Sequence, residues 1–212
     1  MYPTFIEFMS TAIHWSADRP RITVALPVLA LIAAGCVTQQ TPDISMMRIQ
    51  PQPAIVGVTT PGVTVPAGAT FAWLPESIDF HKDQRLQGST LQSMIEQGIK
   101  QNLQDMGYRF VDSVSKSDFS IGYTAALESA LNDDEIMRRF GLLPGSSIAT
   151  VGSAEYEKGS LIIYVMNASS RDVVWRSAVQ AGVDLSAGDA ERKQRLGSLL
   201  KDMFLTFPKA EK

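Results

Sequence analysis

Side chains that commonly perform catalysis are scarce in this sequence. The 212 residues include two histidines, His14 and His81, and one cysteine, Cys36. A zinc site needs three or four closely spaced ligands, and a nucleophilic triad needs a base such as histidine beside its nucleophile. His81 lies in the polar stretch DFHKDQR, which is typical of a solvated loop. We therefore expect no catalytic residue, no metal site and no cofactor from these groups.

Carboxylates are more numerous and leave one route to chemistry open. Three consecutive acids, Asp133–Glu135, follow Asn132, and this pattern is typical of a helix N-terminus, where acids lie near the positive end of the helix dipole. The three acids lack the alternating spacing and the glycine of a calcium loop. A site for acid-based hydrolysis or ligand binding that uses Asp79, Asp83 or Asp133 near a pocket remains an alternative.

The lone cysteine ends an apolar segment near the N-terminus. Arg19 and Arg21 precede about 13 apolar or nearly apolar residues, from Ile22 to Ala34, and Pro27 interrupts them. A positive region followed by a short apolar one is the layout of a signal peptide. A membrane-spanning helix needs roughly 20 apolar residues. The segment therefore predicts export rather than a permanent membrane span.

The three small residues before Cys36, AAG, resemble the lipobox of bacterial lipoproteins. The resemblance implies cleavage between Gly35 and Cys36 and attachment of a diacylglyceryl group to the Cys36 thiol. Residues 1–35 are then a lipoprotein signal peptide. The first eight residues fit a signal peptide badly, so Met9 is an alternative start.

Residues 36–68 are predicted to be the lipidated cysteine and a flexible linker, because they are rich in proline and polar residues and lack aromatic ones. The acyl chains would hold the protein on a membrane without spanning it. By resemblance to Gram-negative lipoproteins, Val37 in place of an aspartate implies sorting to the outer membrane. We expect a lipid-anchored protein on the periplasmic face of that membrane, with residues 69–212 as its single domain.

The charge of the chain argues against nucleic acid as a partner. The net charge is −3, and removal of residues 1–35 takes away two basic and two acidic residues. Binding to a phosphate backbone depends on a stripe or patch of Lys and Arg side chains. The one basic cluster, Arg192, Lys193 and Arg195, is interpreted as the solvated face of a helix.

Hydrophobic periodicity predicts an α+β fold for residues 69–212. Alternation predicts strands at 69–75, closed by Pro75, at 108–114 and at 118–127. Apolar residues at three- and four-residue steps predict amphipathic helices within 88–108 and 189–208. A short helix after Asn132 is expected to serve as a connection. These elements predict a two-layer sandwich, with a mixed, mainly antiparallel sheet of about five strands and two helices on one face.

A hairpin is predicted from the arms 159–167 and 171–179, and the first arm is apolar on both faces. Ile162, Tyr164 and Met166 must therefore either lie under a cover or face outward as an interaction surface. The valine-rich part of the linker could itself be that cover. Trp73 and Trp175 are expected to fill the core beneath the helices.

Four segments together resemble a known family. They are ATFAWLP, SDFSIGY, YEKGSLIIYVMNASSRDVVWRSAV and the closing helix that ends in FP. They resemble the bacterial envelope lipoproteins catalogued as domain of unknown function 4136. That family usually carries an acid in the first arm of the late hairpin and a glycine after Trp-Arg, where this chain has Tyr164 or Asn167 and Ser177. The resemblance implies an exported, lipid-anchored domain with no assigned activity.

Three hypotheses for function follow. The first is a non-enzymatic lipoprotein that binds another envelope protein, or itself, through the sheet face or an edge strand. The second is a small-ligand binder or acid-based hydrolase of the periplasm. The third is a purely structural protein of the outer membrane, with neither a pocket nor an exposed apolar patch.

Overall fold

The computed structural model describes residues 52–86, 90–145 and 156–209, which belong to one compact unit, residues 47–212. The described strands and helices and both described core clusters lie within this unit. The elements, in chain order, are β1 Ala54–Thr59, β2 Thr70–Phe80, η2 Gln84–Leu86, α1 Leu91–Asp105, β3 Arg109–Phe110, η3 Val114–Lys116, β4 Phe119–Leu127, α2 Asp133–Phe140, β5 Tyr156–Asn167, β6 Val173–Asp184 and α3 Asp189–Phe204.

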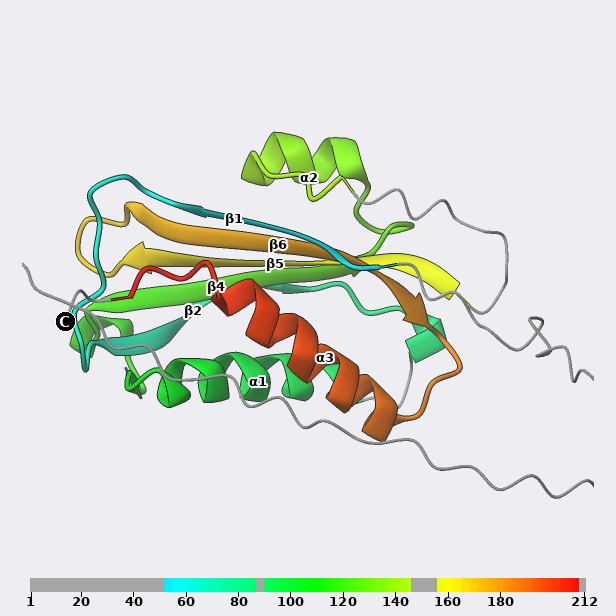
Figure 1. The fold of residues 1–212 in the computed structure, drawn as a ribbon, viewed down its shortest axis with the longest axis horizontal. Helices are drawn as coiled ribbons and strands as arrows, with labels where there is room; N and C mark the ends of the chain where they lie inside the picture. Colours follow the sequence, from blue (N-terminus) through cyan, green and yellow to red (C-terminus); the bar gives the residue numbers. More distant parts are fainter. Residues whose placement is uncertain (1–51, 87–89, 146–155, 210–212) are drawn as a thin grey trace, which may run out of the picture. The chain divides into compact units, whose positions relative to one another are not determined.

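The strands form one six-stranded sheet in the order β1-β6-β5-β4-β2-β3. Neighbours from β1 to β4 are antiparallel, whereas β2 is parallel to both β4 and β3. Figure 1 shows α1 and α3 on one face of this sheet and α2 on the other. The predicted α+β class, the mainly antiparallel sheet and the two helices on one face are confirmed. The sheet has one strand more than expected.

The additional strand is β1, which lies inside the segment expected to be a linker. Its residues pair in antiparallel register with β6, from Ala54 opposite Gln180 to Thr59 opposite Trp175. Val65, further along the expected linker, is fully buried in the main core. The expected boundary at residue 69 is therefore too late. The strand is short and is flanked by prolines and glycines, which are typical of a linker, so the sequence pattern did not predict it.

The first predicted strand also continues further than expected. β2 passes through Pro75 and ends at Phe80, and its register against β4 shifts between Trp73 and Ile78. Proline lacks a donor for the sheet ladder but is tolerated at such irregularities. Pro75 is exposed there, so it interrupts the pairing without ending the strand.

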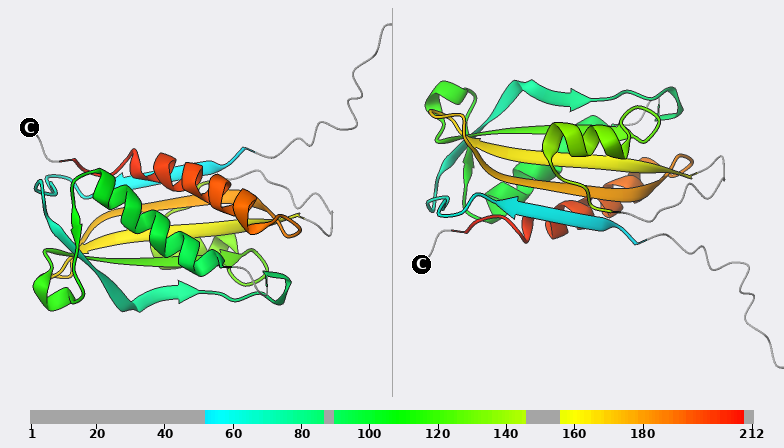
Figure 2. Two further views of the ribbon diagram at one scale, coloured as in Figure 1. Left: turned by 90° about the horizontal axis from the view of Figure 1, so that it is seen from below. Right: turned by 90° about the horizontal axis from the view of Figure 1, so that it is seen from above.

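The helical layer covers the main core. α1 buries Ile95, Ile99 and Leu103, and α3 buries Leu200, Met203 and Phe204, as the three- and four-residue steps predict. Figure 2 shows the two helices side by side across the sheet. A Cβ on Gly98 of α1 would overlap the side chain of Leu200, so this glycine lets the helices approach closely.

The short helix α2 covers the second face of the sheet, which corrects its expected role as a connection. The side chain of Asn132 accepts a hydrogen bond from the backbone N–H of Glu135 at 3.0 Å and caps the helix, and Gly141 ends it with a φ of 61°. Ile136 of α2 packs with Ile162 and other residues in a second, smaller core. Both faces of β5 are therefore covered, which explains why its sequence is apolar on both.

Candidate functional site

Two adjoining apolar cavities lie where the first halves of α1 and α3 meet the end of the sheet. Their volumes are about 120 and about 110 Å³. An engineered cavity of about 150 Å³ binds benzene, so either lobe can hold a small apolar group. We call the two cavities together the aliphatic groove. Its two lobes share the side chains of Leu91, Ala181, Val183, Leu196 and Leu199.

Small residues on the strands create this space. Ala125 on β4, Gly159 on β5 and Ala181 on β6 line the first lobe, opposite larger side chains from the helices. A Cβ on Gly159 would overlap Val183, so the strand surface cannot hold a larger residue at that point without a shift. The first lobe also extends to His81 and Leu86, at the end of β2 and in η2.

Two arginines from α3 line the second lobe. Arg192 donates from Nη2 to the backbone oxygen of Leu185 at 2.9 Å and lies 3.5 Å from a carboxylate oxygen of Asp189. Its Nε is buried and has no acceptor among the described residues. Arg195 is half-buried and also lines a neighbouring hollow formed with Gln52. The basic cluster is therefore partly buried, whereas a fully solvated face was expected.

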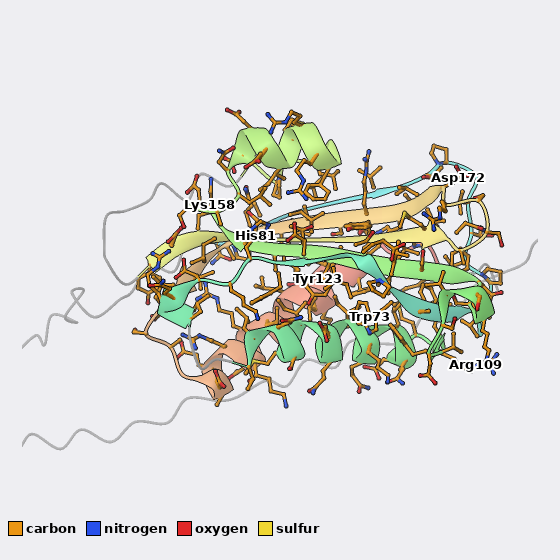
Figure 3. The ribbon with its side chains drawn as sticks, turned by 180° about the vertical axis from the view of Figure 1, so that it is seen from behind. Trp73, His81, Arg109, Tyr123, Lys158 and Asp172 are labelled. Carbon is orange, nitrogen blue, oxygen red and sulfur yellow. The ribbon has the colours of Figure 1, made fainter. Side chains whose placement is uncertain are left out.

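His81 lies at the rim of the groove, beside an acid. Its Nε2 is 3.1 Å from Oδ2 of Asp79, and that same oxygen is 3.3 Å from Nη2 of Arg139 on α2. Figure 3 shows His81 at the end of β2. Asp79 is therefore held between two basic groups rather than paired with a second acid.

The other acids considered for chemistry are also paired with basic groups. Hydrogen bonds from the Arg85 side chain and backbone lower the pKa of Asp83 to about 2. On the other side of Arg85, its Nη1 lies 2.5 Å from Oε2 of Glu157. No group of three or more His, Cys, Asp or Glu side chains among the described residues could hold a metal ion. None of Asp79, Asp83 and Glu157 lines either lobe of the aliphatic groove.

A polar cluster joins β5 to α2. Lys158 is almost fully buried, and its Nζ lies 2.8 Å from Glu128 and 2.9 Å from Asp133. Burial lowers the pKa of Lys158, but its hydrogen bonds to these two acids outweigh burial and hold the pKa above the usual value. Oδ1 of Asp133 accepts a further hydrogen bond from Gln180 at 2.6 Å. Asp133 therefore lies in the first turn of α2 and also links that end of the helix to β5 and β6 of the sheet.

One buried polar contact was missed by sequence analysis. The hydroxyl of Tyr123, in the middle of β4, donates to Glu96 of α1 at 2.9 Å, and Tyr123 is fully buried. Burial first, and then the hydrogen bond to Glu96, raise the pKa of Tyr123 well above its usual value. Figure 3 labels Tyr123 and Trp73 between the sheet and α1. The periodicity of β4 marks Tyr123 as apolar, and no signal in the sequence pairs it with Glu96.

The residues expected to form an interaction surface lie near α2. Ile162 is fully buried in the smaller core, so it lies under a cover and does not face outward. Tyr164 packs on Phe140 of α2 and donates to the backbone oxygen of Ser77 at 2.7 Å. Met166 is half-buried at the edge of a hollow of about 240 Å³ beside α2. The cover is α2 rather than the linker, which contributes β1 at the edge of the sheet.

The two strand tryptophans lie on the helical side, as expected. Trp175 is fully buried, stacks on Phe204 at 5.2 Å between ring centroids and donates from Nε1 to Thr206 at 3.2 Å. Trp73 is half-buried and packs against the main core.

The predicted signal peptide, Gly35 and the lipidation site Cys36 all lie outside the described residues. Within the part of the chain that the structure describes, no helix is long and apolar enough to cross a membrane.

Several solved structures resemble this fold. The PelC dodecamer from Paraburkholderia phytofirmans matches with a TM-score of 0.47 and 8% identity, over 76% of this chain and 100% of that one. A DUF4136 family protein from Bacteroides thetaiotaomicron matches with a TM-score of 0.41 and 13% identity, over 72% and 92% of the two chains. A comparison with curated proteins gives no match.

A family comparison covers most of the chain. The model described as "Domain of unknown function (DUF4136)" matches residues 59–209, from the last residue of β1 to beyond α3. The matched region contains all the segments on which the resemblance in the sequence rested. The chain therefore belongs to the DUF4136 family.

Proposed function

We propose that this chain is a lipid-anchored protein of the cell envelope whose domain binds an apolar ligand in the aliphatic groove and performs no catalysis. The short apolar segment before AAGC supports the anchor. The observation that carries the binding function is the groove itself, whose first lobe is lined mostly by apolar side chains and whose second lobe combines aliphatic side chains with charged ones at one end. Ligand sites are typically apolar concavities with a few polar groups at defined positions.

The pairing of the nearby acids supports binding over hydrolysis. A general acid needs a carboxyl group with a raised pKa, and a general base needs a group whose pKa lies near the operating pH. The pKa of Asp83 is lowered to about 2 by Arg85, and Asp79 lies between His81 and Arg139. The lowered pKa keeps Asp83 ionised at neutral pH, and the contacts of both acids give them a structural role in the fold.

Fluorescence titration with N-phenyl-1-naphthylamine, a neutral apolar probe, tests the proposal. We expect saturable binding to residues 47–212 and at least about tenfold weaker binding to Ala181→Leu, because the added side chain fills the space between the two lobes. Ala130→Leu, at an exposed turn position, is the matched control and should bind like the unaltered protein. Equal binding by Ala181→Leu and the unaltered domain would overturn the proposal.

A second candidate function, association through a sheet edge, is supported by β1. It is an edge strand whose sequence, AIVGVT, carries no charge and no proline. Val58 on this strand is 40% exposed. Unprotected apolar edge strands are templates for pairing with another strand. Sedimentation velocity should show a concentration-dependent dimer that Val58→Lys abolishes, and a monomer at all concentrations would contradict this candidate.

A further inference from the structure

We infer that the aliphatic groove takes a single-chain acidic amphiphile, with its hydrocarbon tail between α1, α3 and the sheet and its acidic head group at Arg192 and Arg195. This inference rests on the proposed function, because it specifies the ligand of the same groove. The lobes of about 120 and about 110 Å³ have room for one chain rather than a pair of acyl chains.

The spacing along α3 places the head-group and tail sites next to each other. Arg192, Arg195, Leu196 and Leu199 recur at three- and four-residue steps and all line the second lobe. Residues at such steps lie on one face of a helix. The two leucines also line the first lobe, whereas the two arginines line only the second of the two lobes. A bound chain therefore meets cations at one end of the groove and aliphatic groups along the rest.

Arg192 has a buried donor that the described residues leave unused. Two of its nitrogens contact Leu185 and Asp189, but the buried Nε has no acceptor there. A buried donor without a partner is costly, so natural structures usually supply one. In this conformation Nε is closed to a ligand, so a head group must shift the Arg192 side chain to reach it. A carboxylate is a suitable acceptor, because it can accept two parallel hydrogen bonds from one guanidinium group.

Arg195 adds a positive charge that no described acid neutralises through a salt bridge. Three acids lie close to the second lobe. Asp189 is already near Arg192, and Asp184 accepts hydrogen bonds from Tyr156 at 2.8 Å and from Ser186 at 2.6 Å. Glu191 lines the same lobe but is exposed to solvent. The half-buried guanidinium of Arg195 beside an apolar cavity is thus complementary to the acidic end of an amphiphile.

Competition between decanoate and decanol for the N-phenyl-1-naphthylamine site tests this inference. Both ligands carry the same tail and are used below the concentration at which decanoate forms micelles. We expect decanoate to displace the probe from residues 47–212 with an affinity at least about tenfold higher than that of decanol. Arg192→Gln and Arg195→Gln should each weaken decanoate several-fold and leave decanol unchanged.

Further variants separate charge from folding. Arg195→Lys keeps the positive charge and should retain most of the preference for decanoate. Arg138→Gln removes an exposed arginine from α2, on the other face of the sheet, and should change neither affinity. If Arg192→Gln does not fold, the effect of Arg195→Gln on decanoate affinity alone tests the inference. Arg195 has no salt bridge within the described part of the chain, so its removal should leave the fold intact.

The outcomes distinguish this inference from the proposed function. Equal affinities for decanoate and decanol, unaffected by the arginine variants, would overturn the acidic head group and leave apolar binding standing. Failure of the probe and of both ligands to bind would overturn the proposed function together with this inference.

Discussion

The ammonium nitrogen of Lys158 on β5 lies 2.9 Å from a carboxylate oxygen of Asp133, the first residue of α2. Lys158 is 5% exposed, and Glu128 lies on its other side. This contact fixes α2 over the second face of the sheet, where Ile136 completes the smaller core. From the sequence alone this lysine would be assigned to the surface, yet it is buried and anchors α2 to the sheet.

Lys158→Met should lower the free energy of unfolding by about 1–3 kcal/mol. Removal of one partner from a fully buried ion pair costs about 3–5 kcal/mol, but both acids here are about one-third exposed and can be solvated. Urea unfolding at pH 7 measures the change. Lys193→Met, at an exposed position on α3, is the control and should change stability by less than about 0.5 kcal/mol. Equal stability of the two variants would show that the Lys158 contacts do not hold α2.

Asp118 should contribute a measurable part of the acid sensitivity of the fold. Hydrogen bonds from the backbone N–H and then the hydroxyl of Thr70, at 2.8 and 2.7 Å, lower the pKa of Asp118 below its usual value. A lowered pKa in the folded state gives stability that is present above about pH 4 and is lost as the pH falls through the folded-state pKa.

Asp118→Asn should therefore reduce the loss of stability between pH 5 and pH 2. The expected difference is below about 1 kcal/mol, because Asp118 is exposed and solvent weakens the effect. Urea midpoints at several pH values measure it. Asp112→Asn, at an exposed position in the segment before η3, provides the comparison. An unchanged acid response in Asp118→Asn would mean that Thr70 does not perturb this carboxylate.

Much of the helical layer could be predicted from the sequence, because periodicity reports directly on burial. The apolar steps through Ile95, Ile99 and Leu103 are the buried face of α1, and those through Leu200 and Phe204 are that of α3. The helix α1 lies between β2 and β3 in the sequence, and a strand–helix–strand crossover places its two strands parallel in the sheet, as β2 and β3 are.

The groove and its arginines could not be predicted in the same way. The groove depends on small residues such as Ala125 and Ala181, which lie far apart in sequence and line one cavity only because the sheet places β4 and β6 on either side of β5. Arg192 and Arg195 look like solvated residues because their burial depends on the end of β6 and the turn after it. Contacts between distant segments leave no periodic signal in a single sequence.

Gly57→Ala tests whether β1 is a true part of the domain. A Cβ at this position would overlap the side chain of Thr206, which follows α3. Overpacking of this kind costs about 1–3 kcal/mol, so the free energy of unfolding should fall by that amount. Gly197→Ala, where nothing lies near the added Cβ, should instead stabilise α3 by about 0.5–1 kcal/mol. If Gly57→Ala leaves the unfolding midpoint unchanged, β1 does not pack against the end of α3.

Cys36→Ser should abolish incorporation of labelled palmitate in cells. The thiol is the group expected to carry the diacylglyceryl chains, and the sequence has no second cysteine to which a thiol-linked label could move. Two acyl chains give stable membrane attachment, whereas a chain without them must stay as the uncut precursor or be released. Intact-mass measurement of the unaltered protein should show cleavage between Gly35 and Cys36. Retention of the label in the serine variant would exclude Cys36 as the site of lipid attachment and would overturn the lipobox interpretation of AAGC.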